Sequence, residues 1–411
     1  MKKTLLCLIV LILLCLSLAA CGKGGEVVTL YVYNWGEYIS DGSEGSLDVN
    51  AAFEEWYEQT YGVRVEVNYS TFSSNEDMYT KLSSGATKYD IVVPSDYMVA
   101  RMIKEGMLRP LNFENIPNIV NIDSEALFGG KAPYYDEENA YSVPYTYGTV
   151  GIIYNTTIVD EADIGSWDIM WNERYQGNIL QFNNSRDAFA TALYYLGYSV
   201  NTTNESEWRE ALELLKTQKS IVQGYVMDEI FNKMENGSAA IAPYYAGDFF
   251  TMYADNEDLA FFYPREGTNI FVDAMCIPEG SQNPEIAEAY INFMLSPEAA
   301  IANAEYICYA SPNKLVKEDP GYIETMQEIH PDAMEILYGT STVRMEAYDN
   351  LAERELSLLN ELWEDLKIES TIGGTIIVTA LVIVGGCIGA GVFLYVRRRR
   401  RRKLVAGLWN D

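Results

Sequence analysis

Apolar residues in the first quarter of the chain alternate between the period of a strand and that of a helix. A strand is expected over residues 27–33. One face of a helix comes next and consists of Val49, Phe53, Trp56 and Tyr57. Gly62 provides a suitable helix end. Residues 63–69 alternate as a strand, and a short buried strand is expected at 91–93. This order predicts βαβ units around a parallel sheet.

The same rhythm returns after residue 141. The expected strands are 143–154, 179–182, 239–244, 259–263 and 271–277, and the expected helices are 187–196, 208–215 and 228–234. Two α/β lobes account for this pattern. Ligands in such folds bind at the carboxyl ends of strands and between domains, so binding residues are expected in the loops that follow the strands.

The N-terminus has the pattern of an export signal. Two lysines precede a short apolar run, and residues 1–20 are therefore expected to be a signal peptide. The string Leu18-Ala19-Ala20-Cys21 resembles the lipobox of bacterial lipoproteins, which implies that Cys21 carries a lipid. An ordinary signal peptide with an incidental cysteine is the alternative.

The C-terminus carries a second apolar run. Residues 371–396 hold no charge and are long enough, at about 1.5 Å per residue, to cross a hydrocarbon core of roughly 30 Å as a transmembrane helix. Six arginines and Lys403 follow directly. The positive-inside rule then places residues 397–411 in the cytoplasm as a basic tail, and the preceding body on the outer side of the cell membrane.

Charge excludes one large class of function. The chain has 411 residues and a formal charge of −30. Without Lys2, Lys3, residues 397–403 and Asp411, it holds 20 basic and 58 acidic residues, about −38. Such a body repels phosphate backbones, so nucleic acid is not an expected partner and cations are favoured.

Histidine and cysteine usage narrows the chemistry further. His330 is the only histidine, which leaves no set of histidine ligands for zinc and makes a surface position at a helix end more plausible than a catalytic one. No metal or other cofactor is expected, and a pair of carboxylates is the remaining route to an enzyme. Cys276 and Cys308 either pair as a disulfide or remain two buried thiols.

The loops after the expected strands combine acids with aromatic residues. In chain order they contain Trp35, Glu37 and Tyr38; Asp96 and Tyr97; Asp187; Tyr244, Tyr245 and Asp248; and Phe271 and Asp273. Carboxylates pair with ammonium groups and aromatic faces hold both cations and aliphatic chains, so the combination suits an organic polycation.

Each of these residues also has a structural explanation. Asp96 and Asp187 stand where helices begin and suit caps. Glu37 and Asp248 suit solvated loops, and the aromatic residues suit a core. Asp273 is the exception, because it interrupts an apolar strand and a carboxylate there needs a partner.

Several longer strings resemble the spermidine/putrescine-binding proteins of bacterial ABC importers, over about residues 29–366. They are Tyr33-Asn34-Trp35-Gly36-Glu37-Tyr38, 69–82 (YSTFSSNEDMYTKL), 89–97 (YDIVVPSDY), 104–108 (KEGML), 142–145 (SVPY), Ser166-Trp167, 196–203 (LGYSVNTT) and 309–313 (YASPN). The resemblance implies a type II periplasmic-binding-protein fold. Residues 26–145 with 274–311 would form lobe 1, and residues 146–273 with 312–368 would form lobe 2.

The resemblance also implies roles for individual residues. Trp35, Tyr245 and Phe271 would flank the aliphatic chain, and Glu37, Asp187, Asp248 and Asp273 would meet the amines. Tyr38, Tyr97 and Tyr309 would supply further contacts. Asp96 is also expected in the site, because of its place in the loop after the strand at 91–93. Relatives often carry Ser or Thr where Gly36 stands, Trp where Tyr245 and Phe271 stand, and sometimes Asp where Asn184 stands. The string Ala246-Gly247-Asp248 is more similar to members that prefer putrescine.

The function implied is non-enzymatic. A monomeric extracytoplasmic protein would capture putrescine or spermidine and deliver it to the permease and ATPase of an ABC importer. Four alternatives stay open: a protein of the same fold for another cation, one for an anion or metal, a carboxylate-pair glycosidase, and a membrane-anchored sensor.

Overall fold

The computed structural model describes residues 27–339 and 343–367. None of the helices within these ranges is both long and apolar enough to cross a membrane. The expected signal peptide with Cys21, the expected transmembrane helix at 371–396 and the basic tail at 397–411 lie outside the described residues.

Within the described residues, ten strands are linked by hydrogen bonds in the order β2-β1-β3-β9-β4-β7-β5-β6, with β8 and β10 added beside β4 and β9. The strands are β1 (Val28–Trp35), β2 (Val65–Phe72), β3 (Ile91–Val92), β4 (Ser142–Asn155), β5 (Ile179–Phe182), β6 (Val222–Val226), β7 (Ile241–Tyr245), β8 (Leu259–Phe262), β9 (Thr268–Cys276) and β10 (Met345–Glu346).

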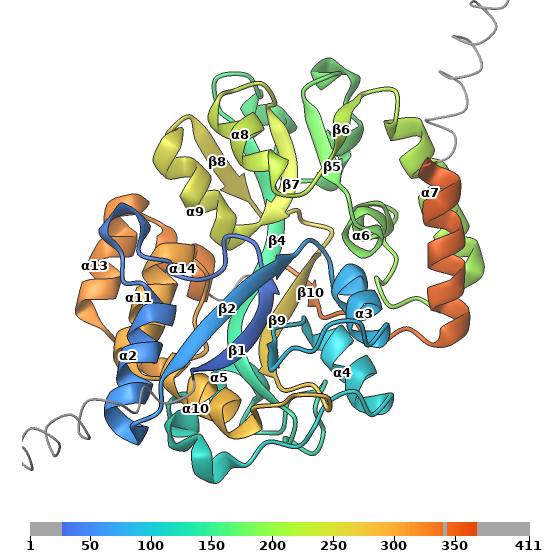
Figure 1. Ribbon diagram of the computed structural model, residues 1–411. Helices are drawn as coiled ribbons and strands as arrows, with labels where there is room; N and C mark the ends of the chain where they lie inside the picture. Colours follow the sequence, from blue (N-terminus) through green and yellow to red (C-terminus); the bar gives the residue numbers. More distant parts are fainter. Residues whose placement is uncertain (1–26, 340–342, 368–411) are drawn as a thin grey trace, which may run out of the picture.

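Helices cover both ends of this array (Figure 1). The α-helices are α2 (Val49–Tyr61), α3 (Asn75–Ser83), α4 (Asp96–Lys104), α5 (Ser124–Phe128), α6 (Ser185–Tyr195), α7 (Glu205–Gln218), α8 (Glu229–Glu235), α9 (Ala246–Asp255), α10 (Pro284–Met294), α11 (Pro297–Ile307), α12 (Lys314–Lys317), α13 (Pro320–Ile329) and α14 (Ala333–Tyr338). The part of the chain that the structure describes also contains six short 3₁₀ turns, and residues 353–367 are helical.

Two lobes result from this arrangement. One lobe contains β1, β2 and β3 with α2, α3, α4 and α10, and the other contains β5, β6, β7 and β8 with α6, α7, α8 and α9 (Figure 1). The long strands β4 and β9 pair with each other and join the lobes, because β9 also pairs with β3 of one lobe and β4 also pairs with β7 of the other. The lobe boundaries expected at 145/146 and 273/274 fall within these two strands.

The prediction of a parallel sheet was wrong for the middle of the array. β1 pairs in parallel with β2 and β3, and β5 with β6 and β7, as the βαβ pattern indicates. β4 is antiparallel to β7, β8 and β9, and β3 is antiparallel to β9. The direction reverses because the chain crosses between the lobes along β4 and returns along β9.

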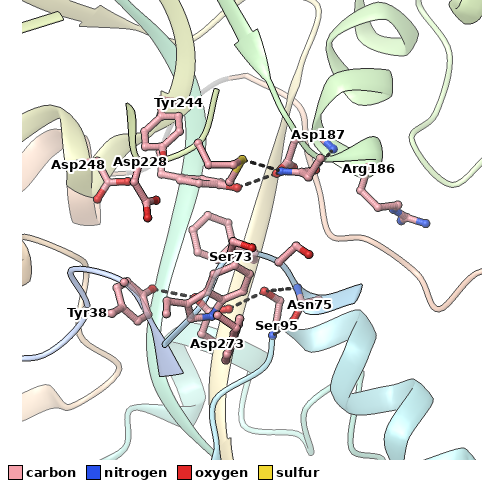
Figure 2. Close-up of a pocket in the computed structure, with 18 of the residues that line it drawn as sticks. Tyr38, Ser73, Asn75, Ser95, Arg186, Asp187, Asp228, Tyr244, Asp248 and Asp273 are labelled. Atoms are coloured by element: carbon pink, nitrogen blue, oxygen red, sulfur yellow. Dashed lines mark hydrogen bonds between the residues drawn. The ribbon is translucent and has the colours of Figure 1, made fainter. Parts of the chain in front are cut away.

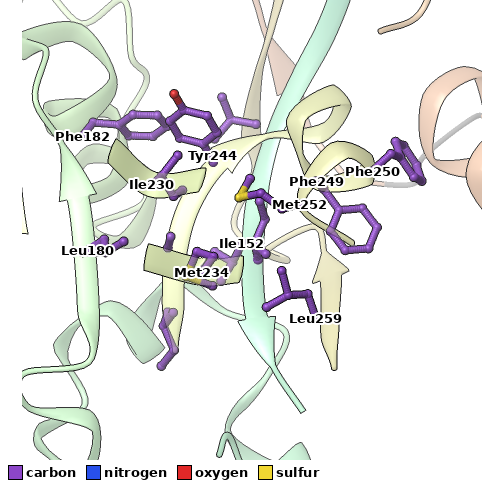
Figure 3. Packing of buried hydrophobic residues seen from close by; sticks show 14 of the residues in the cluster. Ile152, Leu180, Phe182, Ile230, Met234, Tyr244, Phe249, Phe250, Met252 and Leu259 are labelled. Atoms are coloured by element: carbon purple, nitrogen blue, oxygen red, sulfur yellow. The ribbon is translucent and has the colours of Figure 1, made fainter. Parts of the chain in front are cut away.

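Each lobe has its own hydrophobic core. Ile152, Ile230 and Phe249 belong to the core of the lobe that contains β7 (Figure 3), and Leu30, Val49 and Phe53 belong to the other. The expected helix face at 49–57 is confirmed, with α2 capped by Asp48 and ended by Gly62 in the left-handed region at φ 72°.

The single histidine and the two internal cysteines are structural. His330 ends α13, and its ring packs edge-on against Tyr253 and Phe249 of α9. Cys276 and Cys308 are buried and free.

Candidate binding site

A pocket of about 860 Å³ lies between the two lobes, and β9 crosses it (Figure 2). Its described lining contains six carboxylates, one cation and ten aromatic side chains. The carboxylates are Glu37, Glu76, Asp187, Asp228, Asp248 and Asp273, and the cation is Arg186. Ten of the eleven residues expected from the sequence line this pocket; they are Trp35, Glu37, Tyr38, Tyr97, Asp187, Tyr245, Asp248, Phe271, Asp273 and Tyr309.

Three of these residues, Trp35, Glu37 and Tyr38, lie at the end of β1 or in the loop that follows it. Trp35 is the last residue of the strand, and its ring lies 4.5 Å from that of Phe72. Glu37 follows with φ at 49°, a left-handed conformation that turns the chain sharply. The turn leads into Tyr38, whose side chain is buried.

Asp273 has the partners that its position in an apolar strand requires. The hydroxyl of Tyr38 donates to Oδ2 at 2.7 Å, and that of Ser95 donates to Oδ1 at 2.6 Å. Asn75 in turn donates to Ser95 Oγ at 3.1 Å. Only 3% of Asp273 is exposed, and this burial raises its pKa to about 6. The carboxylate is therefore oriented by neutral donors, with no basic residue of the lining bonded to it.

Asp187 begins the opposite wall at the start of α6. Asn184 caps the helix by accepting from Asp187 N, and its amide donates to Asp187 Oδ2 at 2.8 Å. The hydroxyls of Tyr245 and Tyr348 donate to the two carboxylate oxygens at 2.7 and 2.8 Å. Asp187 is thus both an acid in the first turn of α6 and a carboxylate of the pocket lining. The sequence had offered these two roles as alternatives.

Asp248 lies in the first turn of α9. Tyr309 donates to its Oδ2 at 3.0 Å. Burial raises the pKa of Asp248 to about 8, and the charges of Asp228 and Glu37 add to the rise. Gly247 makes the Tyr309 contact possible, because a Cβ at this position would lie 2.2 Å from the tyrosine ring.

Aromatic side chains form the walls between the acids. The rings of Tyr245 and Phe271 meet edge to face at 5.3 Å. Phe271 lies over Gly148 of the paired strand, where a Cβ would come within 2.8 Å of the ring. Phe271 also lies 6.3 Å from Tyr309, so these rings form one continuous wall.

Asp96 was expected in the site and lies outside its lining. The side chain is fully buried at the start of α4 and accepts from Val272 N at 3.2 Å and from the hydroxyl of Tyr134. This carboxylate holds α4 against β9, which is the structural role of a first-turn acid. The neighbouring Tyr97 does line the pocket and donates to Glu76 Oε1 at 3.0 Å.

Several lining residues were not expected from the sequence, including two acids, Glu76 and Asp228. Arg186 was not expected either; it is 5% exposed and stacks on Tyr348 and Tyr97, with its guanidinium carbon 4.3 and 5.3 Å from their ring centres. Asp228 had a usable signal, since it stands two residues after the end of a strand. That strand, β6, was itself missing from the expected elements.

Comparison with known proteins identifies the family. The profile described as bacterial extracellular solute-binding protein matches residues 51–328. The spermidine/putrescine-binding periplasmic protein of Salmonella typhimurium is 35% identical over 318 residues, which cover 76% of this chain and 85% of that protein. The chain belongs to the bacterial extracellular solute-binding family.

Two further relatives agree with this assignment. The putrescine/cadaverine-binding protein of Pseudomonas aeruginosa is 28% identical over 87% of this solute-binding protein and 99% of its own length. The structure of the spermidine/putrescine ABC transporter substrate-binding protein PotD from Streptococcus pneumoniae is 34% identical, with a TM-score of 0.63 over 83% of this chain and 99% of that one.

These relatives confirm three expectations. The resemblance to spermidine/putrescine-binding proteins is confirmed, and so is the two-lobed α/β periplasmic-binding-protein fold. The relatives are binding proteins of transporters, so this solute-binding protein is not an enzyme. Membership of this family also places the described part of the protein outside the cytoplasm.

Proposed function

We propose that this solute-binding protein captures a linear polyamine, putrescine or spermidine, and delivers it to the permease and ATPase of an ABC importer. The observation that carries the proposal is the composition of the pocket between the lobes, whose lining holds six carboxylates and ten aromatic side chains but only one basic residue. Carboxylates pair with ammonium groups and aromatic faces pack against methylenes, so this lining suits a linear polyamine. The names of its relatives support the same ligand class.

We infer the individual roles from the resemblance and from the presence of these side chains in the pocket lining. Trp35, Tyr245 and Phe271 flank the methylenes. Glu37, Asp187, Asp248 and Asp273 meet the ammonium groups, and Tyr38, Tyr97 and Tyr309 orient those carboxylates or close the walls. The strongly negative body raises the local concentration of cations and speeds their arrival. Closure of the lobes around the ligand then presents a defined surface to the permease.

Calorimetric titration of the purified full chain with putrescine, spermidine, spermine and arginine tests this proposal. Saturable one-to-one binding of a polyamine, with arginine much weaker, is the expected result. Preference for arginine would favour the second candidate, a protein of this fold for another cationic solute, because guanidinium groups also pair with carboxylates. Absence of heat and of thermal stabilisation with every polyamine would reject the ligand class.

We further propose that Cys21 carries a lipid and that residues 371–396 span the membrane, on the sequence patterns of the two ends. Either attachment would keep the body close to the permease and raise its effective concentration there. Membrane fractionation of cells that express Cys21→Ser, a deletion of 371–396, or both, tests the two attachments separately. Release of the body by either single change would show that the other attachment is absent.

A further inference from the structure

Asp228 reaches across the pocket from one lobe to the other. The residue directly precedes α8, in the lobe that contains β7, whereas Gly36 follows β1 in the opposite lobe. A Cβ on Gly36 would lie 3.2 Å from Oδ2 of Asp228. The φ of Gly36 is not positive, so what limits a side chain here is the close approach of Asp228 and not the backbone conformation.

Three carboxylates gather at this end of the pocket. Figure 2 shows Asp228 and Asp248 side by side, and the charges of Asp228 and Glu37 both help to raise the pKa of Asp248. No lysine or arginine among the described residues forms an ion pair with any of the three. Glu37 belongs to one lobe and the two aspartates to the other, so closing the lobes brings like charges together.

Tyr244 adds an independent feature at the same end. The side chain is 3% exposed, lines the pocket and lies beside Asp228 and Asp248 (Figure 2). Its hydroxyl has no hydrogen-bond partner among the residues that the structure describes. Because this hydroxyl makes no hydrogen bond to the described protein and its side chain lines the pocket, it is available to a group bound there.

We propose that Glu37, Asp228, Asp248 and the Tyr244 hydroxyl bind one primary ammonium group of the ligand, and that this ammonium holds the two lobes together. The inference rests on the proposed function and deepens it. An ammonium has three N–H donors and one positive charge, which suits acceptors that arrive from both lobes. The cation offsets the repulsion between Glu37 and Asp228 and favours the ionised form of Asp248, so closure at this end depends on its presence.

The opposite end of the pocket differs in charge. Asp187 already accepts from Tyr245, Tyr348 and Asn184, and Arg186 stands beside it. The Asp228 end therefore attracts an ammonium more strongly, and it fixes the direction in which an unsymmetrical polyamine enters.

Calorimetry on the full chain tests the inference, with the polyamine that the wild type binds most tightly. Asp228 is exposed at the rim, so Asp228→Asn should fold normally, and its affinity should fall tenfold or more. Glu235→Gln, which removes a charge from the far end of the same helix outside the lining, is the matched control and should change affinity less than twofold. A trimethylammonium derivative of the polyamine should also bind at least tenfold more weakly, because it cannot donate hydrogen bonds.

The contact with Gly36 supplies a second test. Gly36→Thr should lower affinity at least tenfold by displacing the Asp228 carboxylate, and Asp228→Ser should lower it to a similar degree. The double variant should bind no more weakly than either single variant, because both changes disturb one contact. Additive losses, or wild-type affinity in Asp228→Asn, would overturn this inference alone. A wild-type chain that binds no polyamine would overturn the proposed function and this inference with it.

Discussion

Tyr38 and Asp273 are 235 positions apart in the chain, yet the tyrosine hydroxyl donates to the aspartate at 2.7 Å. Tyr38 belongs to the loop after β1, and Asp273 belongs to the strand that returns between the lobes. The bond therefore connects the loop after β1, which lines the pocket, to β9, one of the two strands that join the lobes. A ligand amine that meets Asp273 meets a carboxylate whose orientation is already set.

Replacing Asp273 with asparagine should weaken polyamine binding without unfolding the protein. Tyr38 and Ser95 retain an acceptor, but the pocket loses a charge-assisted hydrogen bond, worth about 1.5–3 kcal/mol or roughly tenfold to a hundredfold in affinity. Calorimetry on both variants, Asp273→Asn and the control Asp96→Asn, measures the effect. Asp96 is buried beside the same strand but outside the lining, so its variant should lose stability and keep its affinity within about threefold. Equal losses of affinity in the two variants would contradict the assignment.

Polyamine affinity should rise with pH from about 6 to about 8. Burial raises the pKa of Asp248 to about 8 and that of Asp273 to about 6, so both carboxylates bind protons that an ammonium ligand must displace. Titrations in two buffers with different ionisation enthalpies should reveal proton release on binding near pH 7. Asp248→Asn should remove the part of the pH dependence near pH 8. Affinity that is constant over this range would show that neither carboxylate meets the ligand.

The ligand-free protein should lose stability as the pH rises from about 4 to about 7. Burial raises the pKa of Asp96 from 3.8 to about 7. Between these values the folded chain binds more protons than the unfolded chain, and the free energy of unfolding then falls as the pH rises. Thermal melts at pH 5 and pH 8 check the direction, and Asp96→Asn should show a smaller difference between the two. A larger difference in that variant would contradict the role given to Asp96.

A methyl group at Gly247 should disturb the site through Tyr309. The new Cβ would lie 2.2 Å from the ring, and the ring would have to move away from Asp248. Overpacking of this kind costs about 1–3 kcal/mol. Gly247→Ala should therefore lower both the melting temperature and the polyamine affinity. Gly224→Ala, in β6 with no atom within 4 Å of the added carbon, is the matched control and should change neither. A Gly247→Ala protein with full affinity would show that Tyr309 does not position Asp248.

Local pattern was sufficient to predict most individual elements. The alternation at 27–33 marks β1, and the helical spacing from Val49 to Tyr57 marks α2, because one face of each is buried against the same core. The mixed direction of the sheet could not be predicted in the same way. Whether β4 runs parallel or antiparallel to β9 depends on how the chain returns between lobes, and side-chain periodicity is the same in both cases.

The residues of the site also fall into those that could be predicted from the sequence and those whose place depends on the fold. The acids and aromatic residues after the strands, the family and the extracytoplasmic body could all be predicted from the sequence, because they depend on residue type and order. The folded arrangement is what turns Asp96 toward the backbone of β9 and Asp228 toward Gly36 across the pocket. Both aspartates stand at helix starts in the sequence. The two aspartates differ in the surface against which the first turn of each helix packs. This surface is set by contacts between residues more than a hundred positions apart in the chain.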